Sequence, residues 1–122
     1  MNEKFIQNLD KLPADVRREF ALLANRYGEK KKQDTIQTDF LSFVRHVWPD
    51  FIEGSHHKRI ADKFNKLASG EIKRLIINMP PRHTKSEFGS YLLPAWMVGR
   101  NPKLKIIQST NTTELSVRFG RK

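Results

Sequence analysis

Residues 72–91 constrain the fold of this chain more than any other stretch. Residues 75–77, Leu-Ile-Ile, have the length and character of a strand that is buried on both faces. Pro80 and Pro81 come next, and neither can donate a hydrogen bond to a sheet. From Ser86 a helix is expected, with apolar residues near one face: Phe88, Leu92, Ala95 and Trp96. A strand, a loop, Lys-Ser and a helix, in this order, are the setting that a phosphate-binding loop requires.

The residue types around this loop suit phosphate chemistry. A helix N-terminus offers unpaired N–H groups and a partial positive charge to an anion. Lys85 would reach the β- and γ-phosphates of ATP as a point charge, and Ser86 would offer its hydroxyl to Mg²⁺. Arg82 adds a fork of donors that matches phosphate oxygens. The stretch therefore predicts that ATP and Mg²⁺ bind here.

The match to the pattern G-x-x-x-x-G-K-[ST] is incomplete. Lys85 and Ser86 occupy its last two positions, but Thr84 and Met79 stand where the pattern has glycines. A Cβ at position 84 restricts the backbone and its approach to a phosphate. The spacing alone therefore leaves open a second interpretation, in which a strand ends at the two prolines and the lysine is incidental.

Three motifs resemble the N-terminal ATPase region of the large subunit of tailed-phage terminases. They are Met-Pro-Pro-Arg-His-Thr-Lys-Ser-Glu at residues 79–87, Leu-Pro-Ala-Trp at 93–96 and Gly-Arg-Asn-Pro at 99–102. The resemblance runs from about residue 40 to residue 122 and is specific at 78–102. That family has a deviant Walker A loop with two prolines, an arginine and then Gly-Lys-Ser or a variant, so Thr84 departs from its commoner glycine.

The resemblance implies a viral DNA-packaging motor. ATP hydrolysis by a ring of copies at the procapsid portal, in the host cytoplasm, would drive double-stranded DNA into the shell, and a C-terminal endonuclease domain would cut it. The implied partners are double-stranded DNA, the portal protein, the small terminase subunit and other copies of the chain.

The resemblance also implies roles for single residues. Lys85 and Ser86 carry over as phosphate and Mg²⁺ contacts, and Arg82 carries over as a mobile arginine that senses or stabilises the γ-phosphate. The remaining loop residues become nucleotide contacts, namely Pro81, His83 and Thr84. In terminase-like chains the segment before the first strand helps to hold the adenine, which makes His57 a candidate for the base pocket.

The expected fold class is α/β. Residues 104–109 are the second predicted strand, and a strand, a helix and a strand joined by a crossover would form a parallel pair. We expect a helical N-terminal segment over residues 1–54 and the first part of a P-loop ATPase domain over 55–122. Because Mg²⁺ and the attacking water need an acidic strand end that these residues lack, the chain is expected to be an N-terminal fragment, truncated before Walker B.

Besides the helix from Ser86, helices are predicted at four places. The first runs from Pro13 to a C-cap at Gly28, followed by a solvated linker at 29–34. The second covers 39–48 with Thr38 as its cap, and the third covers 56–69, between Ser55 and Gly70. The last begins at Glu114.

The charge is concentrated in the second half of the chain. Residues 55–122 contain 14 Lys and Arg against 4 Asp and Glu, whereas residues 1–54 contain nine of each. A basic half indicates a polyanionic partner, so a DNA-binding module without nucleotide chemistry remains an alternative, as does an inactive truncated relic. No cysteine and no long apolar run are present, so neither disulfides nor a membrane are expected.

Overall fold

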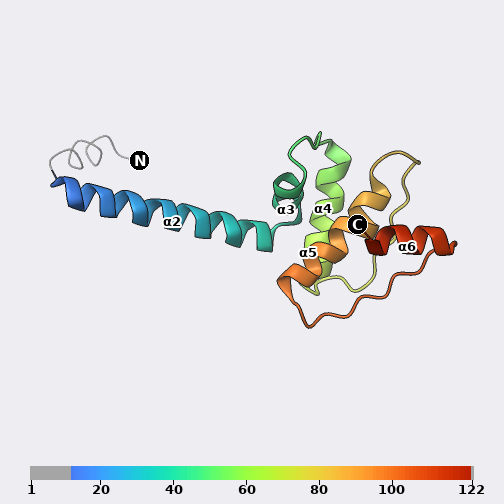
Figure 1. The fold of residues 1–122 in the computed structure, drawn as a ribbon. Coiled ribbons are helices and arrows are strands. Elements are labelled where there is room, and N and C mark those ends of the chain that lie inside the picture. The colour runs from blue at the N-terminus through green and yellow to red at the C-terminus, as the bar shows by residue number, and fades with distance from the viewer. Residues whose placement is uncertain (1–11, 122) are drawn as a thin grey trace. The chain divides into compact units, whose positions relative to one another are not determined.

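The computed structural model describes residues 12–121. They form five α-helices and one π-helical segment, in the order α2 (Ala14–Thr38), α3 (Phe40–Val47), α4 (Ser55–Ala68), η1 (Glu87–Leu92), α5 (Leu93–Arg100) and α6 (Thr113–Arg121) (Figure 1). The chain divides into two compact units between Asp34 and Thr35. Among the described helices, none is both long enough and apolar enough to cross a lipid bilayer.

The first unit is formed by most of α2, which has no buried residue. The helix continues through Gly28 and through 29–34, so the predicted C-cap and linker were wrong. A glycine inside a helix costs only about 1 kcal/mol relative to alanine, and the Glu-Lys-Lys-Lys-Gln run that follows consists of good helix formers. Gly28 therefore lowers the stability of α2 locally without ending it.

In the second unit, α3 and α4 are joined through their polar ends. Asp39, not the predicted Thr38, is the N-cap of α3, and its carboxylate accepts from Ser42 N at 2.7 Å. Asn65 of α4 accepts from Phe40 N at 2.9 Å and donates to Asp39 Oδ1 at 2.9 Å. Burial raises the pKa of Asp39, but hydrogen bonds from Ser42 and Asn65 outweigh it, so the pKa lies below its usual value.

An aromatic cluster forms the core of this unit. Phe40 is completely buried and makes edge-to-face contacts with three rings, with centroid distances of 5.0 Å to Phe64, 5.4 Å to Phe88 and 5.4 Å to Trp96. Trp96 also donates its indole N–H to Ile36 O at 2.9 Å. The four rings come from α3, α4, η1 and α5, so each of these elements is held to the others through Phe40.

Pro94 explains the π-helical segment. Proline has no N–H to donate to the carbonyl four residues earlier, which is that of Ser90. The helix widens just before it: Leu93 N bonds to Phe88 O, five residues back, and Gln108 Nε2 donates to the Ser90 carbonyl. The helix therefore does not end at Pro94 but forms a π-turn that continues into α5.

The predicted parallel sheet was wrong, because residues 12–121 contain no strand. Residues 75–77 are extended, but they alternate: Leu75 and Ile77 pack against the helical core and Ile76 is 86% exposed. Ile107, at the centre of the other predicted strand, is 96% exposed. Neither of the two apolar runs, at 75–77 and 104–109, is a buried strand. The buried apolar residues of this unit lie on its helices. The expected α/β class is therefore corrected to all-helical for the described residues.

Candidate functional site

The loop before η1 has two residues in the left-handed region of backbone conformation. Arg82 has φ 65° and Thr84 has φ 56°. Each such non-glycine residue costs roughly 1–3 kcal/mol, and a β-branched threonine there is a clear outlier. Thr84 occupies the second glycine position of the phosphate-loop pattern, so the structure gives it the conformation that glycine adopts most easily.

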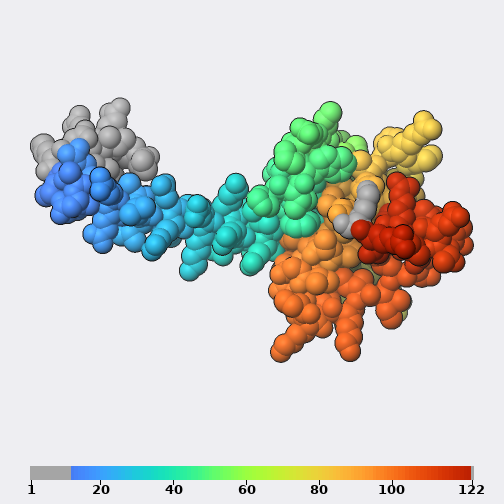
Figure 2. Space-filling model, viewed as in Figure 1, coloured from blue at the N-terminus to red at the C-terminus, as the bar shows by residue number. Residues whose placement is uncertain are grey.

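The helix after the loop begins at Lys85, and Thr84 directly precedes it. The first helical hydrogen bond runs from Phe88 N to Thr84 O at 2.9 Å, so the N–H groups of Lys85 and Ser86 precede it. Such N–H groups are the donors that a helix N-terminus presents to an anion. In Figure 2 the yellow residues around position 80 form a projection on the surface of the second unit.

A chain of three hydrogen bonds connects the first turn of α4 to this loop. Gly54 N donates to His57 Nδ1 at 2.9 Å, so Nδ1 is an acceptor and the proton is on Nε2. His57 Nε2 therefore donates to Thr84 Oγ1, at 2.7 Å. Thr84 Oγ1 in turn donates to His83 O at 2.7 Å. The hydroxyl of Thr84 thus accepts one hydrogen bond and donates another.

His57 is held in place by aromatic packing. Its ring contacts those of Phe51 and Phe88, with centroid distances of 4.8 and 5.0 Å, and the residue is only 5% exposed. Burial lowers the pKa of His57, and the nearby His56 and His83 lower it further, against an opposing effect of Glu53. The neutral imidazole that the hydrogen bonds require is thus also the form that its surroundings favour.

The other predicted site residues lie in the loop with exposed side chains. Lys85 Nζ lies 3.5 Å from Met79 O, so the lysine folds back over the loop. His83 Nδ1 contacts Pro81 O at 3.0 Å. Arg82 and Ser86 are exposed beside them. The structure therefore brings Arg82, Lys85 and Ser86 into one short loop, with His57 beneath it.

This donor set fits a phosphate group with its metal ion. It combines a guanidinium, an ammonium, a hydroxyl and helix N–H groups, which are the partners that phosphate oxygens use. The described residues contain no group of three or more His, Asp or Glu side chains that could hold a metal. Ser86 would therefore contribute one oxygen to an Mg²⁺ ion that the nucleotide brings with it.

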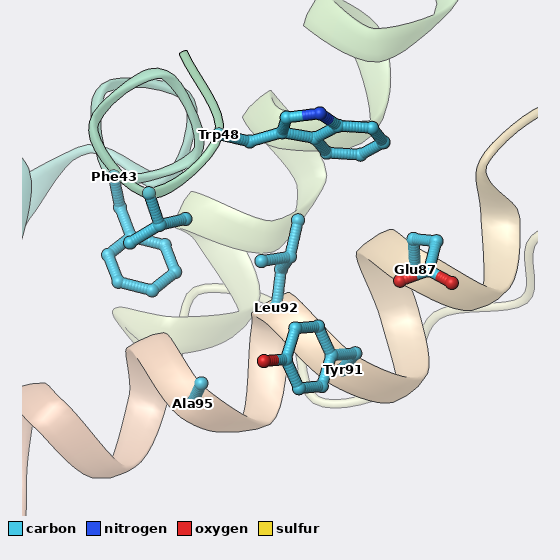
Figure 3. A pocket seen from close by; sticks show the side chains of 7 residues that line it. Phe43, Trp48, Glu87, Tyr91, Leu92 and Ala95 are labelled. Atoms are coloured by element: carbon cyan, nitrogen blue, oxygen red, sulfur yellow. The ribbon is translucent and has the colours of Figure 1, made fainter. Parts of the chain in front are cut away.

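An apolar groove of about 520 Å³ lies next to the loop, between α3 and the helix 87–100. Figure 3 shows Trp48 and Tyr91 facing this space with Leu92 between them, and Glu87 beside them. The complete lining is Phe43, Val47, Trp48, Glu87, Tyr91, Leu92 and Ala95. This size is typical of small-molecule sites, but the lining suits an aromatic or aliphatic group rather than a phosphate.

Sequence reasoning found the loop but not what supports it. The bond between His57 and Thr84 joins residues 27 positions apart. A threonine at a position that favours glycine was the one available sign that another residue must stabilise the loop. The base contact predicted for His57 and the γ-phosphate role predicted for Arg82 stay predictions.

The lowered pKa of His57 predicts a pH-dependent stability. Between its lowered pKa in the fold and the value of about 6.5 in an unfolded chain, only the unfolded state binds the proton. The stability contribution is therefore complete above about pH 6.5 and is lost as the pH falls through the folded pKa, at up to about 1.4 kcal/mol per pH unit. Urea unfolding at pH 7.5 and 5.5 measures the free energy of unfolding. Its decrease between the two pH values should be smaller in His57→Asn than in the natural chain. An equal loss in both proteins would contradict the assignment.

Comparisons of this chain with protein-family models, with curated proteins and with solved structures find no match. The resemblance to terminase large subunits therefore rests on the motifs at 78–102 and stays a prediction.

Proposed function

We propose that residues 79–86 bind the phosphates of ATP together with Mg²⁺, as the nucleotide-binding loop of a DNA-packaging motor of the terminase large-subunit kind. The observation that supports this most is the left-handed conformation of Thr84 directly before Lys85 and Ser86. A strained residue at this position is typical of a loop whose geometry serves a ligand.

Three side chains have defined roles in this proposal. Lys85 moves from the Met79 carbonyl to the β- and γ-phosphates, Arg82 contacts the γ-phosphate from the other side of Thr84, and Ser86 orients the metal ion. Mg²⁺ supplies charge neutralisation when it is bound with the nucleotide. Double-stranded DNA, the portal protein, the small subunit and other copies of the chain are partners of the proposed motor.

The basic charge of residues 55–122 favours one competing function, a DNA-binding module without nucleotide chemistry. Both proposals predict DNA binding that weakens steeply with salt, because counterions are released from the phosphate backbone. Only the motor proposal predicts a separate site for a triphosphate.

Calorimetric titration of the full chain with ATP, AMP and pyrophosphate, each with Mg²⁺, tests the proposal. We expect ATP and pyrophosphate to compete for one site and AMP to bind more weakly, since Lys85 and Arg82 act on the outer phosphates. A 20-base-pair duplex, titrated at two salt concentrations, is the comparison. Duplex binding without any binding of ATP would contradict the nucleotide proposal and favour the DNA-binding module.

A further inference from the structure

Residue 84 lies in a conformation that its own side chain disfavours. Thr84 is β-branched and has φ 56°, within a turn in which Arg82 is also left-handed, with φ 65°. Glycine would reach the same conformation without steric cost. A contact that holds the side chain of Thr84 would offset the steric cost of this conformation.

The contact comes from α4. His57 Nε2 donates to the Thr84 hydroxyl at 2.7 Å, and that hydroxyl donates to the carbonyl of His83 at 2.7 Å. Together these bonds fix the side chain of Thr84 relative to its own backbone and to α4. A glycine at position 84 would have no hydroxyl through which the loop could be held.

The side chain of His57 is itself restrained by packing and by a second hydrogen bond. The ring of His57 is buried against Phe51 and Phe88, and its second nitrogen accepts from Gly54 N at 2.9 Å. Phe88 belongs to η1, the helix that follows the loop. One imidazole therefore connects the N-terminus of α4, the loop and the start of η1.

We propose that His57 is a positioning residue, which holds Thr84 in the left-handed conformation and thereby orients the N–H groups of Lys85 and Ser86 for a phosphate. The proposal rests on the proposed function of the loop. In this chain a histidine–threonine pair replaces the conformational freedom that glycine gives to other phosphate-binding loops.

Two substitutions separate the two bonds of His57. In His57→Asn, the side-chain oxygen lies near the place of Nδ1, so the acceptor for Gly54 N is kept and the donor to Thr84 is lost. In His57→Gln, the amide nitrogen reaches the place of Nε2 and the donor is kept. His56→Asn is the matched control, since the His56 ring lies 3.8 Å from that of His57 but none of the described hydrogen bonds to the loop involves it.

Binding of Mg²⁺-ATP by the full chain is the first measurement. We expect His57→Asn to weaken binding about threefold to tenfold, which is the value of one neutral hydrogen bond, and His57→Gln and His56→Asn to change it less than twofold. In a Thr84→Gly chain, His57→Asn should have no further effect, because glycine needs no anchor. An equal loss in the natural chain and in the Thr84→Gly chain would overturn the proposal and make His57 a merely structural residue.

The pH profile of binding adds a check on the same residue. Three titratable groups face His57: Glu53 from the segment before α4, His56 from α4 and His83 from the loop. Glu53 is paired with Arg45 at 2.6 Å and Lys58 at 3.4 Å, so it stays charged across the range tested. ATP affinity should fall in the natural chain as the pH falls through the lowered pKa of His57, and it should fall less in His57→Asn, because protonation of Nδ1 removes the acceptor for Gly54 N.

Trypsin cleavage without nucleotide makes the test independent of the proposed function. The peptide bond between Arg82 and His83 lies within the strained turn. Mass spectrometry can compare the rate of cleavage at this bond with the rate of cleavage after Lys105. We expect faster cleavage after Arg82 in His57→Asn than in the natural chain and in His57→Gln. Unchanged cleavage would overturn the positioning role. Faster cleavage in a chain that binds no ATP would keep that role and refute only the nucleotide function.

Discussion

Replacing Lys85 by alanine is expected to weaken ATP binding about tenfold to a hundredfold while leaving the chain folded. A hydrogen bond to a charged group contributes about 1.5–3 kcal/mol, and about 1.4 kcal/mol corresponds to a tenfold change in affinity. In the free protein, Lys85 is exposed and its ammonium contacts Met79 O at 3.5 Å, a long hydrogen bond. Little folding energy depends on that contact.

A matched variant separates the site from the general basic charge. Lys105→Ala removes the same charge from an exposed residue outside the loop. ATP affinity in this variant should stay within about twofold of the natural chain, whereas affinity for a DNA duplex should fall by a similar amount in both variants. Equal ATP affinity in the two variants would show that Lys85 acts only through net charge, and the loop would then not be a nucleotide site.

The helices with clear end signals could be predicted from the sequence. α4 covers Ser55–Ala68, close to the predicted range of 56–69, and ends before Gly70, which has φ 81°. Its N-cap is Gly54 and not the predicted Ser55. α6 begins within one residue of the predicted Glu114. In both cases local propensity and hydrophobic period agree, so no distant contact was needed to define the element.

The two predicted strands were wrong because their local sequence is compatible with several structures. A run of three or four apolar residues is compatible with a strand, a short helix or an extended segment, and only pairing with another strand makes it a sheet. Residues 75–77 instead place alternate side chains against the core of α3, α4 and α5. The aromatic residues at 40, 64, 88 and 96 bury their surface against one another, so tertiary packing decided what the short apolar runs became.

The candidate site also combines a local sequence motif with a contact between distant residues. Lys85 and Ser86 could be recognised in the sequence because they are adjacent residues of a short motif. The anchoring of Thr84 by His57 depends on how α4 packs near Phe88, and no spacing rule connects residues so far apart in the chain. A local motif can thus be recognised in the sequence, while the contact that holds the loop conformation is seen only in the fold.

Phe40→Ala is expected to have the largest effect on stability, because α3, α4, η1 and α5 all pack around that ring. Phe40 is fully buried, and its ring contacts Phe64, Phe88 and Trp96 at 5.0–5.4 Å. Removing a buried phenylalanine ring costs about 3–5 kcal/mol, through lost transfer energy and the cavity left behind. Proteins have total stabilities of only about 5–15 kcal/mol, so this loss is a large fraction of the total and should shift the unfolding midpoint strongly.

Urea unfolding followed by helical circular dichroism and by tryptophan fluorescence measures this effect. Fluorescence reports on the core because Trp96 is only 2% exposed and contacts Phe40 directly. Ile107→Ala is the control, since it also shortens a large apolar side chain but at a residue that is 96% exposed, where a change within about 0.5 kcal/mol is expected. If the midpoints of the two variants coincided, Phe40 would not be the centre of the core. Loss of tryptophan signal with α-helical signal retained would instead show that α2, which has no buried residue, stays helical when the second unit unfolds.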